Sequence, residues 1–173
     1  MIPPALRSLH LIDIENLCRT GQPDQTRLAA CDALYRSMVP VRSGDLLIVG
    51  TGGDPTTRYL VGRTYGGVRV RWSPGPDGAE RAITGALADE PDVLGRFGYL
   101  VIGSGDNAFT SIANYYAMVG LMVTVVAPPG SLARSLRAVA HRVLVLERPG
   151  VRQAADAEPV ALSAGPWSAG LAS

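Results

Sequence analysis

Short, continuous apolar runs alternate with amphipathic helical stretches along most of this 173-residue chain. Strands are predicted at the runs LHLID, DLLIVG, VRVRW, GYLVIG, LMVTVVA and RVLVL. Helices are predicted between them, over about residues 25–38, 58–64, 77–88, 108–119 and 132–139. Apolar strands that alternate with helices are typical of a parallel sheet covered on both faces. We therefore expect a three-layer α/β/α sandwich with a mainly parallel sheet and a Rossmann-like topology.

The periodic pattern ends close to residue 148. Hydrophobic residues make up 47% of the sequence, which is enough to supply the core of one domain of this length. After Pro149 the sequence becomes rich in Ala, Pro, Ser and Gly and loses its periodicity. We predict one domain over residues 1–148 and a C-terminal tail over residues 149–173.

The composition bears on the compartment and on the partners of the chain. None of the apolar runs approaches the roughly 20 residues that a membrane-spanning helix needs, and the N-terminus does not resemble an export signal. The two cysteines, Cys18 and Cys31, form no CxxC pair and are too few for a disulfide framework. We therefore expect a cytoplasmic protein without membrane association. A net charge of +1 argues against coating nucleic acid by charge alone but permits a local arginine patch.

Two of the predicted strands end in acidic segments. The first runs into Asp13-Ile14-Glu15-Asn16, and GYLVIG runs into Ser104-Gly105-Asp106-Asn107. In open parallel sheets, ligands bind outside the carboxyl ends of the strands, near the point where the strand order reverses. The two acidic segments should therefore approach one another if these strands are neighbours in the sheet.

Carboxylates that gather in a crevice repel one another unless a cation is present. A hard divalent ion such as Mg²⁺ takes one or two carboxylates and keeps several water molecules for exchange with substrate phosphates. Bound metal can activate a water and neutralise the charge that grows on a phosphodiester under attack. The acidic strand ends therefore favour hydrolysis of RNA or DNA.

The same segments resemble the NYN domain family of the PIN-like nuclease superfamily, of the LabA-like or DUF88 type. His10-Leu-Ile-Asp13-Ile-Glu-Asn16 is similar to the opening "hDxxN" strand of that family. Val-Ile-Gly103-Ser-Gly-Asp106-Asn-Ala-Phe is similar to its "GSGDxDF" strand end, and the segment from Ser135 to Leu146 to its closing "SLxxxADxFhxL". Asp77-Gly-Ala-Glu80 stands where the family has "KGxD" at the head of a helix. The resemblance covers nearly all of residues 9–146.

This resemblance implies a PIN-like fold and a metal-dependent endoribonuclease that binds RNA and uses Mg²⁺ or Mn²⁺. Carried over position by position, it makes Asp13, Asp106 and Glu80 the catalytic residues and metal ligands. Asn16 would orient the first carboxylate or contact phosphate, and the small polar residues Ser104 and Asn107 suit phosphate contacts. PIN-like domains often pair, so a homodimer is an open expectation.

The sequence also departs from the family pattern. Ala108 stands where the family often has a second Asp, Glu80 replaces an Asp, and His141 stands where the closing motif has Asp. A domain short of one carboxylate could have lost catalysis and kept binding. The alternative function is therefore a catalytically weakened NYN-like module that binds RNA or a protein.

Each candidate residue also has a structural interpretation. Asp13 and Asp106 could cap the segments that follow them, and Glu80 could be a first-turn acid that faces a helix dipole. Gly103-x-Gly105-x-x-Ala108 fits a dinucleotide-binding fingerprint, although Asp106 would then lie where the pyrophosphate approaches. A haloacid-dehalogenase-type phosphatase normally needs a lysine, and all sixteen basic residues here are arginines.

Overall fold

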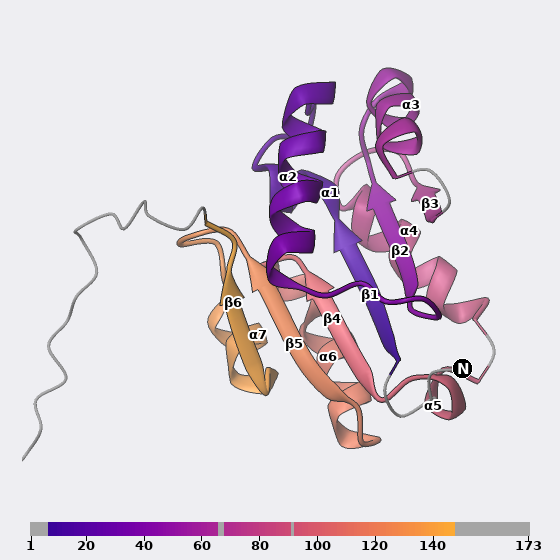
Figure 1. The fold of residues 1–173 in the computed structure, drawn as a ribbon, viewed down its shortest axis with the longest axis vertical. Coiled ribbons are helices and arrows are strands. Elements are labelled where there is room, and N and C mark those ends of the chain that lie inside the picture. Colours follow the sequence, from indigo (N-terminus) through magenta and orange to yellow (C-terminus); the bar gives the residue numbers. More distant parts are fainter. Residues whose placement is uncertain (1–6, 66–67, 91, 148–173) are drawn as a thin grey trace, which may run out of the picture.

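Six parallel strands form one sheet in the order β3-β2-β1-β4-β5-β6 in the computed structural model, which describes residues 7–65, 68–90 and 92–147 (Figure 1). The strands are β1 (Ser8–Asp13), β2 (Leu46–Thr51), β3 (Arg69–Trp72), β4 (Tyr99–Gly103), β5 (Met122–Ala127) and β6 (Arg142–Val145). The predicted parallel sheet is confirmed. The predicted tail over 149–173 lies outside the described residues.

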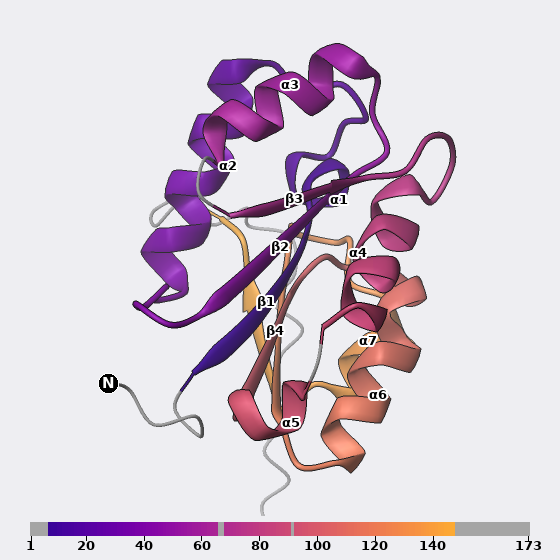
Figure 2. The ribbon, with the colours of Figure 1, turned by 90° about the vertical axis from the view of Figure 1, so that its right-hand side faces the viewer.

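Helices cover both faces of the sheet, as Figure 2 shows edge-on, so the architecture is a three-layer α/β/α sandwich. One face carries α1 (Ile14–Cys18), α2 (Gln25–Met38) and α3 (Pro55–Thr64). The other face carries α4 (Gly78–Ala88), α5 (Val93–Arg96), α6 (Thr110–Met118) and α7 (Arg134–Val139). A short 3₁₀ helix, η2 (Asn107–Phe109), precedes α6.

Alternate residues of the central strand serve the two cores. Leu9 and Leu11 of β1 are fully buried in the core under α4 to α6, and Ile12 is fully buried in the core under α1 to α3. On α2, Leu28, Cys31 and Tyr35 face this second core, which is the helical face that the sequence predicts. Their burial attaches α2 to the sheet through the hydrophobic effect.

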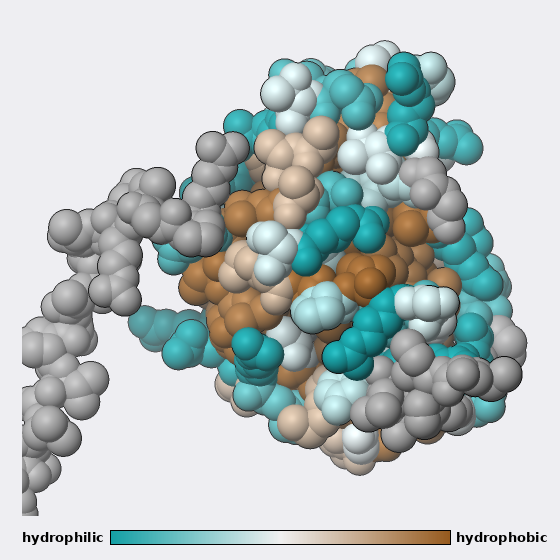
Figure 3. All heavy atoms as spheres, viewed as in Figure 1, coloured by the Kyte–Doolittle hydropathy of each residue, from teal (hydrophilic) through white to brown (hydrophobic). Residues whose placement is uncertain are grey.

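The β5 and β6 part of the face that carries α2 exposes hydrophobic side chains, shown in brown in Figure 3. Met122 of β5 is 50% exposed and Tyr99 of β4 is 37% exposed. On this face, α1 and α3 pack mainly on β1, β2 and β3, so the sheet is less well covered toward β5 and β6.

Differences from the predicted elements are local and have identifiable causes. The sequence predicts no helix over α1, but Asp13 ends β1 by capping α1, with its carboxylate accepting a hydrogen bond from the Asn16 N–H. Helix α3 begins three residues earlier than predicted, because Asp54 caps it and Pro55 suits its first turn. The predicted helix over 108–119 is split into η2 and α6.

No helix in the described part of the chain combines the length and the apolar character needed to cross a membrane.

Candidate active site

The acidic ends of β1 and β4 lie side by side at the point where the strand order reverses. The two strands pair in parallel, with Ile12 opposite Gly103. Connections leave β1 toward β2 and β3 on one side, and β4 toward β5 and β6 on the other. The expected approach of the two acidic segments is therefore confirmed by the sheet order, and it creates the crevice in which open α/β sheets bind ligands.

Asp13 lies at the base of this crevice and is only 8% exposed. One carboxylate oxygen, Oδ1, accepts a hydrogen bond from the backbone N–H of Asn16 at 3.2 Å. The other, Oδ2, accepts one from the Ser104 hydroxyl at 3.2 Å, across the β1–β4 pair. These two bonds fix the carboxylate plane and hold the two strand ends together.

The electrostatic environment of Asp13 opposes its ionisation. The pKa of Asp13 is raised from 3.8 to about 6, chiefly by burial and also by the negative charges of Glu15 and Asp106, while the two hydrogen bonds act in the opposite direction. Among the residues that the structure describes, no ion pair neutralises Asp13 when it is ionised, so its charge adds to those of the two nearby carboxylates.

Asn16 ties the first acidic segment to the second. Its side-chain oxygen accepts a hydrogen bond from the Gly105 N–H at 2.9 Å. Gly105 is required at this point, because a Cβ there would lie 2.4 Å from the Ser131 carbonyl oxygen. The Ala133 N–H also donates to the Gly105 carbonyl at 2.8 Å, so this loop is bonded on both sides.

Asp106 is exposed and caps η2, because its Oδ1 accepts a hydrogen bond from the Ala108 N–H at 3.0 Å. Its own N–H donates to the Ser104 hydroxyl at 3.2 Å. In a dinucleotide-binding loop, the pyrophosphate accepts hydrogen bonds from the backbone N–H groups at this turn. Here the Ala108 N–H donates to the Asp106 carboxylate instead, so the local geometry disfavours the dinucleotide interpretation. Asn107 is exposed and is not among the residues that line the crevice.

The third wall of the crevice is the N-terminus of α4. Asp77 precedes the helix with a φ of 55°, and its side chain makes no capping hydrogen bond. Gly78 allows the helix to approach the ends of β2 and β3, since a Cβ there would lie 2.1 Å from the Ser73 carbonyl oxygen. Glu80 follows in the first turn of α4.

These three walls enclose a cleft of about 350 Å³. Four of the predicted site residues line it together, namely Asp13, Asn16, Glu80 and Asp106, and Ala108 and Asp77 line it as well. Ser104 does not. It is fully buried beneath Asp13, so a direct contact with substrate does not fit its position, and it positions the Asp13 carboxylate instead.

The three predicted metal ligands share the cleft without converging on one point. Within residues 7–65, 68–90 and 92–147, no group of three or more His, Cys, Asp or Glu side chains could hold a metal ion. Mg²⁺ commonly uses only one or two protein carboxylates and completes its shell with water. Asp13 and Asp106 are oxygen donors of this kind, and Asp106 is near enough for its charge to raise the pKa of Asp13. Glu80 does not join them in a three-ligand group among the described residues.

Glu15 has a defined role in the cleft, although it is not among the candidate site residues that the sequence indicates. Its Oε1 accepts hydrogen bonds from the Thr51 hydroxyl at 2.5 Å and from the N–H groups of Gly52 and Gly53 at 2.9 and 3.2 Å. Glu15, Gly52 and Gly53 all line the cleft. The signal in the sequence was a Gly-Gly turn directly after a strand, which offers backbone N–H groups to an acid on the neighbouring strand end.

No protein-family model matches the chain, and no curated protein matches it. The structure is similar to the crystal structure of a protein of unknown function from Vibrio parahaemolyticus RIMD 2210633, with a TM-score of 0.53 and 16% sequence identity. The similarity covers 85% of this chain and 97% of that chain. At this identity the likeness shows the fold alone, a three-layer α/β/α sandwich.

Proposed function

We propose that this protein is a metal-dependent ribonuclease that hydrolyses phosphodiester bonds of RNA in the cleft at the β1–β4 strand ends. The observation that carries the proposal is that acidic side chains from three separate elements line one cleft. Asp13 ends β1, Asp106 follows β4 and Glu80 lies in the first turn of α4, and all three line the cleft. Three segments that are well separated in the sequence supply these groups.

The charge of the site supports a divalent cation. The raised pKa of Asp13, about 6, has burial as its main cause and the nearby Glu15 and Asp106 as further causes. A cation beside Asp13 would relieve this repulsion and lower the pKa. Mg²⁺ or Mn²⁺ would be held by Asp13 and Asp106, and it would supply an activated water and neutralise charge on the scissile phosphate.

The remaining residues orient these two carboxylates and contact the substrate. Ser104 and the Asn16 backbone hold the Asp13 carboxylate through its two oxygens. The Asn16 side chain lines the cleft while its oxygen fixes the loop before Asp106. The side chain of Asp77, the N-cap residue of α4, makes no capping hydrogen bond, so N–H groups in the first turn of α4 suit a phosphate at the opposite wall.

A binding module without catalysis is the second candidate function. The observation that favours it is the lack of a converging third carboxylate among the described residues, together with Ala108 in the cleft wall. The substitution Ala108→Asp discriminates the two functions, because it adds a carboxylate two residues from Asp106. We expect it to raise cleavage by the nuclease, whereas a binding module without activity would bind RNA less well through added charge repulsion.

The test of the proposed function is cleavage of a labelled single-stranded RNA by purified protein with Mg²⁺, Mn²⁺ or EDTA. We expect metal-dependent cleavage that falls at least about a hundredfold in Asp13→Asn and Asp106→Asn, as for other removed catalytic groups. Asp24→Asn is the matched control, because Asp24 also caps a helix but is exposed and outside the cleft. Metal-dependent cleavage that persists in both cleft variants would contradict this assignment of the site.

A further inference from the structure

Two exposed aromatic side chains, each with an arginine over its ring, lie beside the cleft on α3 and β3. Tyr59 of α3 is 61% exposed and Trp72 of β3 is 38% exposed. The Arg58 guanidinium lies 5.2 Å from the Trp72 ring centroid, and that of Arg63 lies 5.8 Å from the Tyr59 ring centroid. We call these four residues the Arg–aromatic platform. Figures 1 and 2 show α3 and β3 as neighbours at the same end of the molecule.

The platform is continuous with the proposed catalytic cleft. The indole N–H of Trp72 donates a hydrogen bond to the Gly53 carbonyl at 2.7 Å, and Gly53 lines the cleft. Arg58 also lines a shallow groove of about 470 Å³ on the outer side of α3, together with Pro55, Tyr59, Gly62 and Arg63. A chain that leaves the cleft past Gly53 would therefore meet Trp72, then Arg58, and then the groove beside Tyr59.

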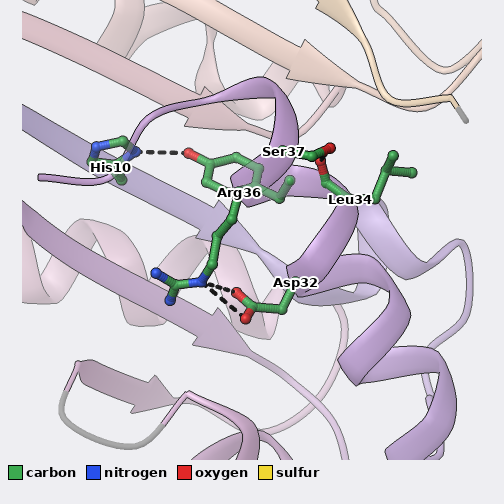
Figure 4. A network of polar contacts seen from close by, with 6 residues as sticks. His10, Asp32, Leu34, Arg36 and Ser37 are labelled. Carbon is green, nitrogen blue, oxygen red and sulfur yellow. Dashed lines mark hydrogen bonds and ion pairs between the residues drawn. The ribbon is translucent and has the colours of Figure 1, made fainter. Parts of the chain in front are cut away.

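The arginines of the platform are not neutralised by carboxylates. Across the residues that the structure describes, ion pairs form at Arg36, Arg69 and Arg96, and none forms at Arg58 or Arg63. Figure 4 shows the contrast on α2, where the Arg36 guanidinium meets Asp32 one turn earlier. No acidic side chain of the described residues lines the groove. The platform thus offers positive charge and aromatic faces together.

These two properties match single-stranded nucleic acid. Bases that are not paired stack on aromatic rings or on arginine planes, and the phosphates between them contact guanidinium groups. A duplex keeps its bases stacked on one another and cannot use such rings. A protein partner would not need unpaired arginines beside each ring.

We propose that the Arg–aromatic platform binds the single-stranded flank of the RNA substrate, with bases on Tyr59 and Trp72 and phosphates on Arg58 and Arg63. This inference rests on the proposed ribonuclease function for the identity of the strand. It assigns the substrate class as single-stranded RNA that extends from the cleft across β3 and α3.

Fluorescence anisotropy of a fluorescein-labelled oligouridine tests whether the platform binds single strands. The oligouridine has about 16 nucleotides, a length within the range of single-strand binding sites. EDTA is present so that metal-dependent cleavage does not occur during the measurement. We expect Tyr59→Ala and Trp72→Leu to weaken binding about tenfold each, which corresponds to about 1.4 kcal/mol and lies within what one stacked base contributes. Trp72→Phe should keep most of the affinity because it keeps a ring. Tyr115→Ala is the matched control, because Tyr115 is 56% exposed on α6 and lies outside the cleft and groove.

The arginines are tested through salt dependence. Arg58→Gln combined with Arg63→Gln should reduce the slope of log affinity against log salt by about 0.7 for each lost phosphate contact. Arg42→Gln, at an exposed position before β2, should leave the slope unchanged. An unchanged slope in the double variant would contradict phosphate contacts at the platform.

Trp72 fluorescence gives a direct readout of stacking. The sequence has two tryptophans, so Trp167→Phe leaves Trp72 as the single indole fluorophore. We expect saturable quenching by unlabelled oligouridine at the concentrations that saturate the anisotropy. Two results would overturn the platform. One is wild-type affinity for oligouridine in the Tyr59 and Trp72 variants, with circular dichroism spectra that match wild type. The other is Trp72 fluorescence that stays unquenched while oligouridine binds.

The outcomes separate this inference from the proposed function. Oligouridine binding that depends on the platform, without metal-dependent cleavage, would refute the ribonuclease and keep the platform. Cleavage that needs Asp13 and metal, with binding insensitive to the platform variants, would refute the platform alone.

Discussion

Replacement of Asp13 by Asn should stabilise the protein while removing its proposed activity. Asp13 is 8% exposed, and its folded-state pKa is about 6 against 3.8 in the unfolded chain. Because the folded value is the higher one, the stability from this group is present below about pH 4 and is lost as the pH rises through 6. At pH 8 the ionised carboxylate should cost about 3 kcal/mol relative to a neutral group.

The Asp13→Asn variant should recover most of this free energy. Its new side-chain amide can still accept a hydrogen bond from the Asn16 N–H, but the buried Ser104 hydroxyl loses its carboxylate acceptor, which costs about 1 kcal/mol. The net gain in the free energy of unfolding at pH 8 should be about 2 kcal/mol, or about 4–8 °C in Tm for a domain of this size. The gain should disappear near pH 4, where the native carboxyl is protonated.

The assay is urea and thermal unfolding of wild type and Asp13→Asn in EDTA at pH 4, 6 and 8, followed by circular dichroism. Asp24→Asn provides the matched control, because it exchanges the same groups at an exposed helix cap and should change stability by less than about 0.5 kcal/mol at each pH. A variant that is less stable than wild type at pH 8, or a difference that does not change with pH, would refute the electrostatic argument.

Three further predictions concern buried His10 of β1 and two residues that shape the cleft. The pKa of buried His10 is lowered to about 4, chiefly by burial, so the neutral ring stabilises the fold above pH 6.5 and this stability is lost as the pH falls toward 4. The free energy of unfolding should therefore fall by about 2 kcal/mol between pH 7 and pH 5. A His10 pKa above 6.5 in an NMR titration would contradict this. Gly105→Ala should destabilise by about 2 kcal/mol in urea unfolding, because its Cβ would meet the Ser131 carbonyl; an unchanged midpoint would refute the close approach. Glu15→Ala should increase hydrogen exchange at Gly52 at least about tenfold, because the Gly52 N–H loses its acceptor, and should affect Gly53 less, because the Gly53 N–H keeps a bond to the Thr51 hydroxyl. Unchanged exchange at Gly52 would show that the loop holds without Glu15.

Much of the fold could be predicted because its determinants are local in the sequence. The apolar runs mark the six strands, and the predicted bounds of α2 agree with the structure because Asp24 and Val39 flank an amphipathic stretch. Helix α1 could not be predicted in the same way, since Ile14, Leu17 and Cys18 continue the apolar run of β1. The strand ends at Asp13 because its side chain caps α1, and a hydrophobicity pattern does not indicate which residue will act as a helix cap.

The site could be predicted in outline, and its detail depends on distant partners. Strand-end acids in an alternating α/β pattern indicate the crevice, because strand order alone brings β1 and β4 together. The hydrogen bond between Ser104 and Asp13 joins residues that are 91 positions apart in the sequence. The three hydrogen bonds to Glu15 join residues that are 36 to 38 positions apart. Such contacts follow from the register of neighbouring strands and the height of each loop, which a single sequence does not specify.

Calorimetric titration with Mn²⁺ tests directly whether Asp13 and Asp106 hold one divalent cation at the junction of β1 and β4, as we propose. Wild type and Asp24→Asn should bind one ion with the same affinity, and Asp13→Asn and Asp106→Asn should each bind it at least about tenfold more weakly, which corresponds to about 1.4 kcal/mol. Equal Mn²⁺ affinity in all four proteins, or no binding by wild type, would contradict a cation site formed by Asp13 and Asp106.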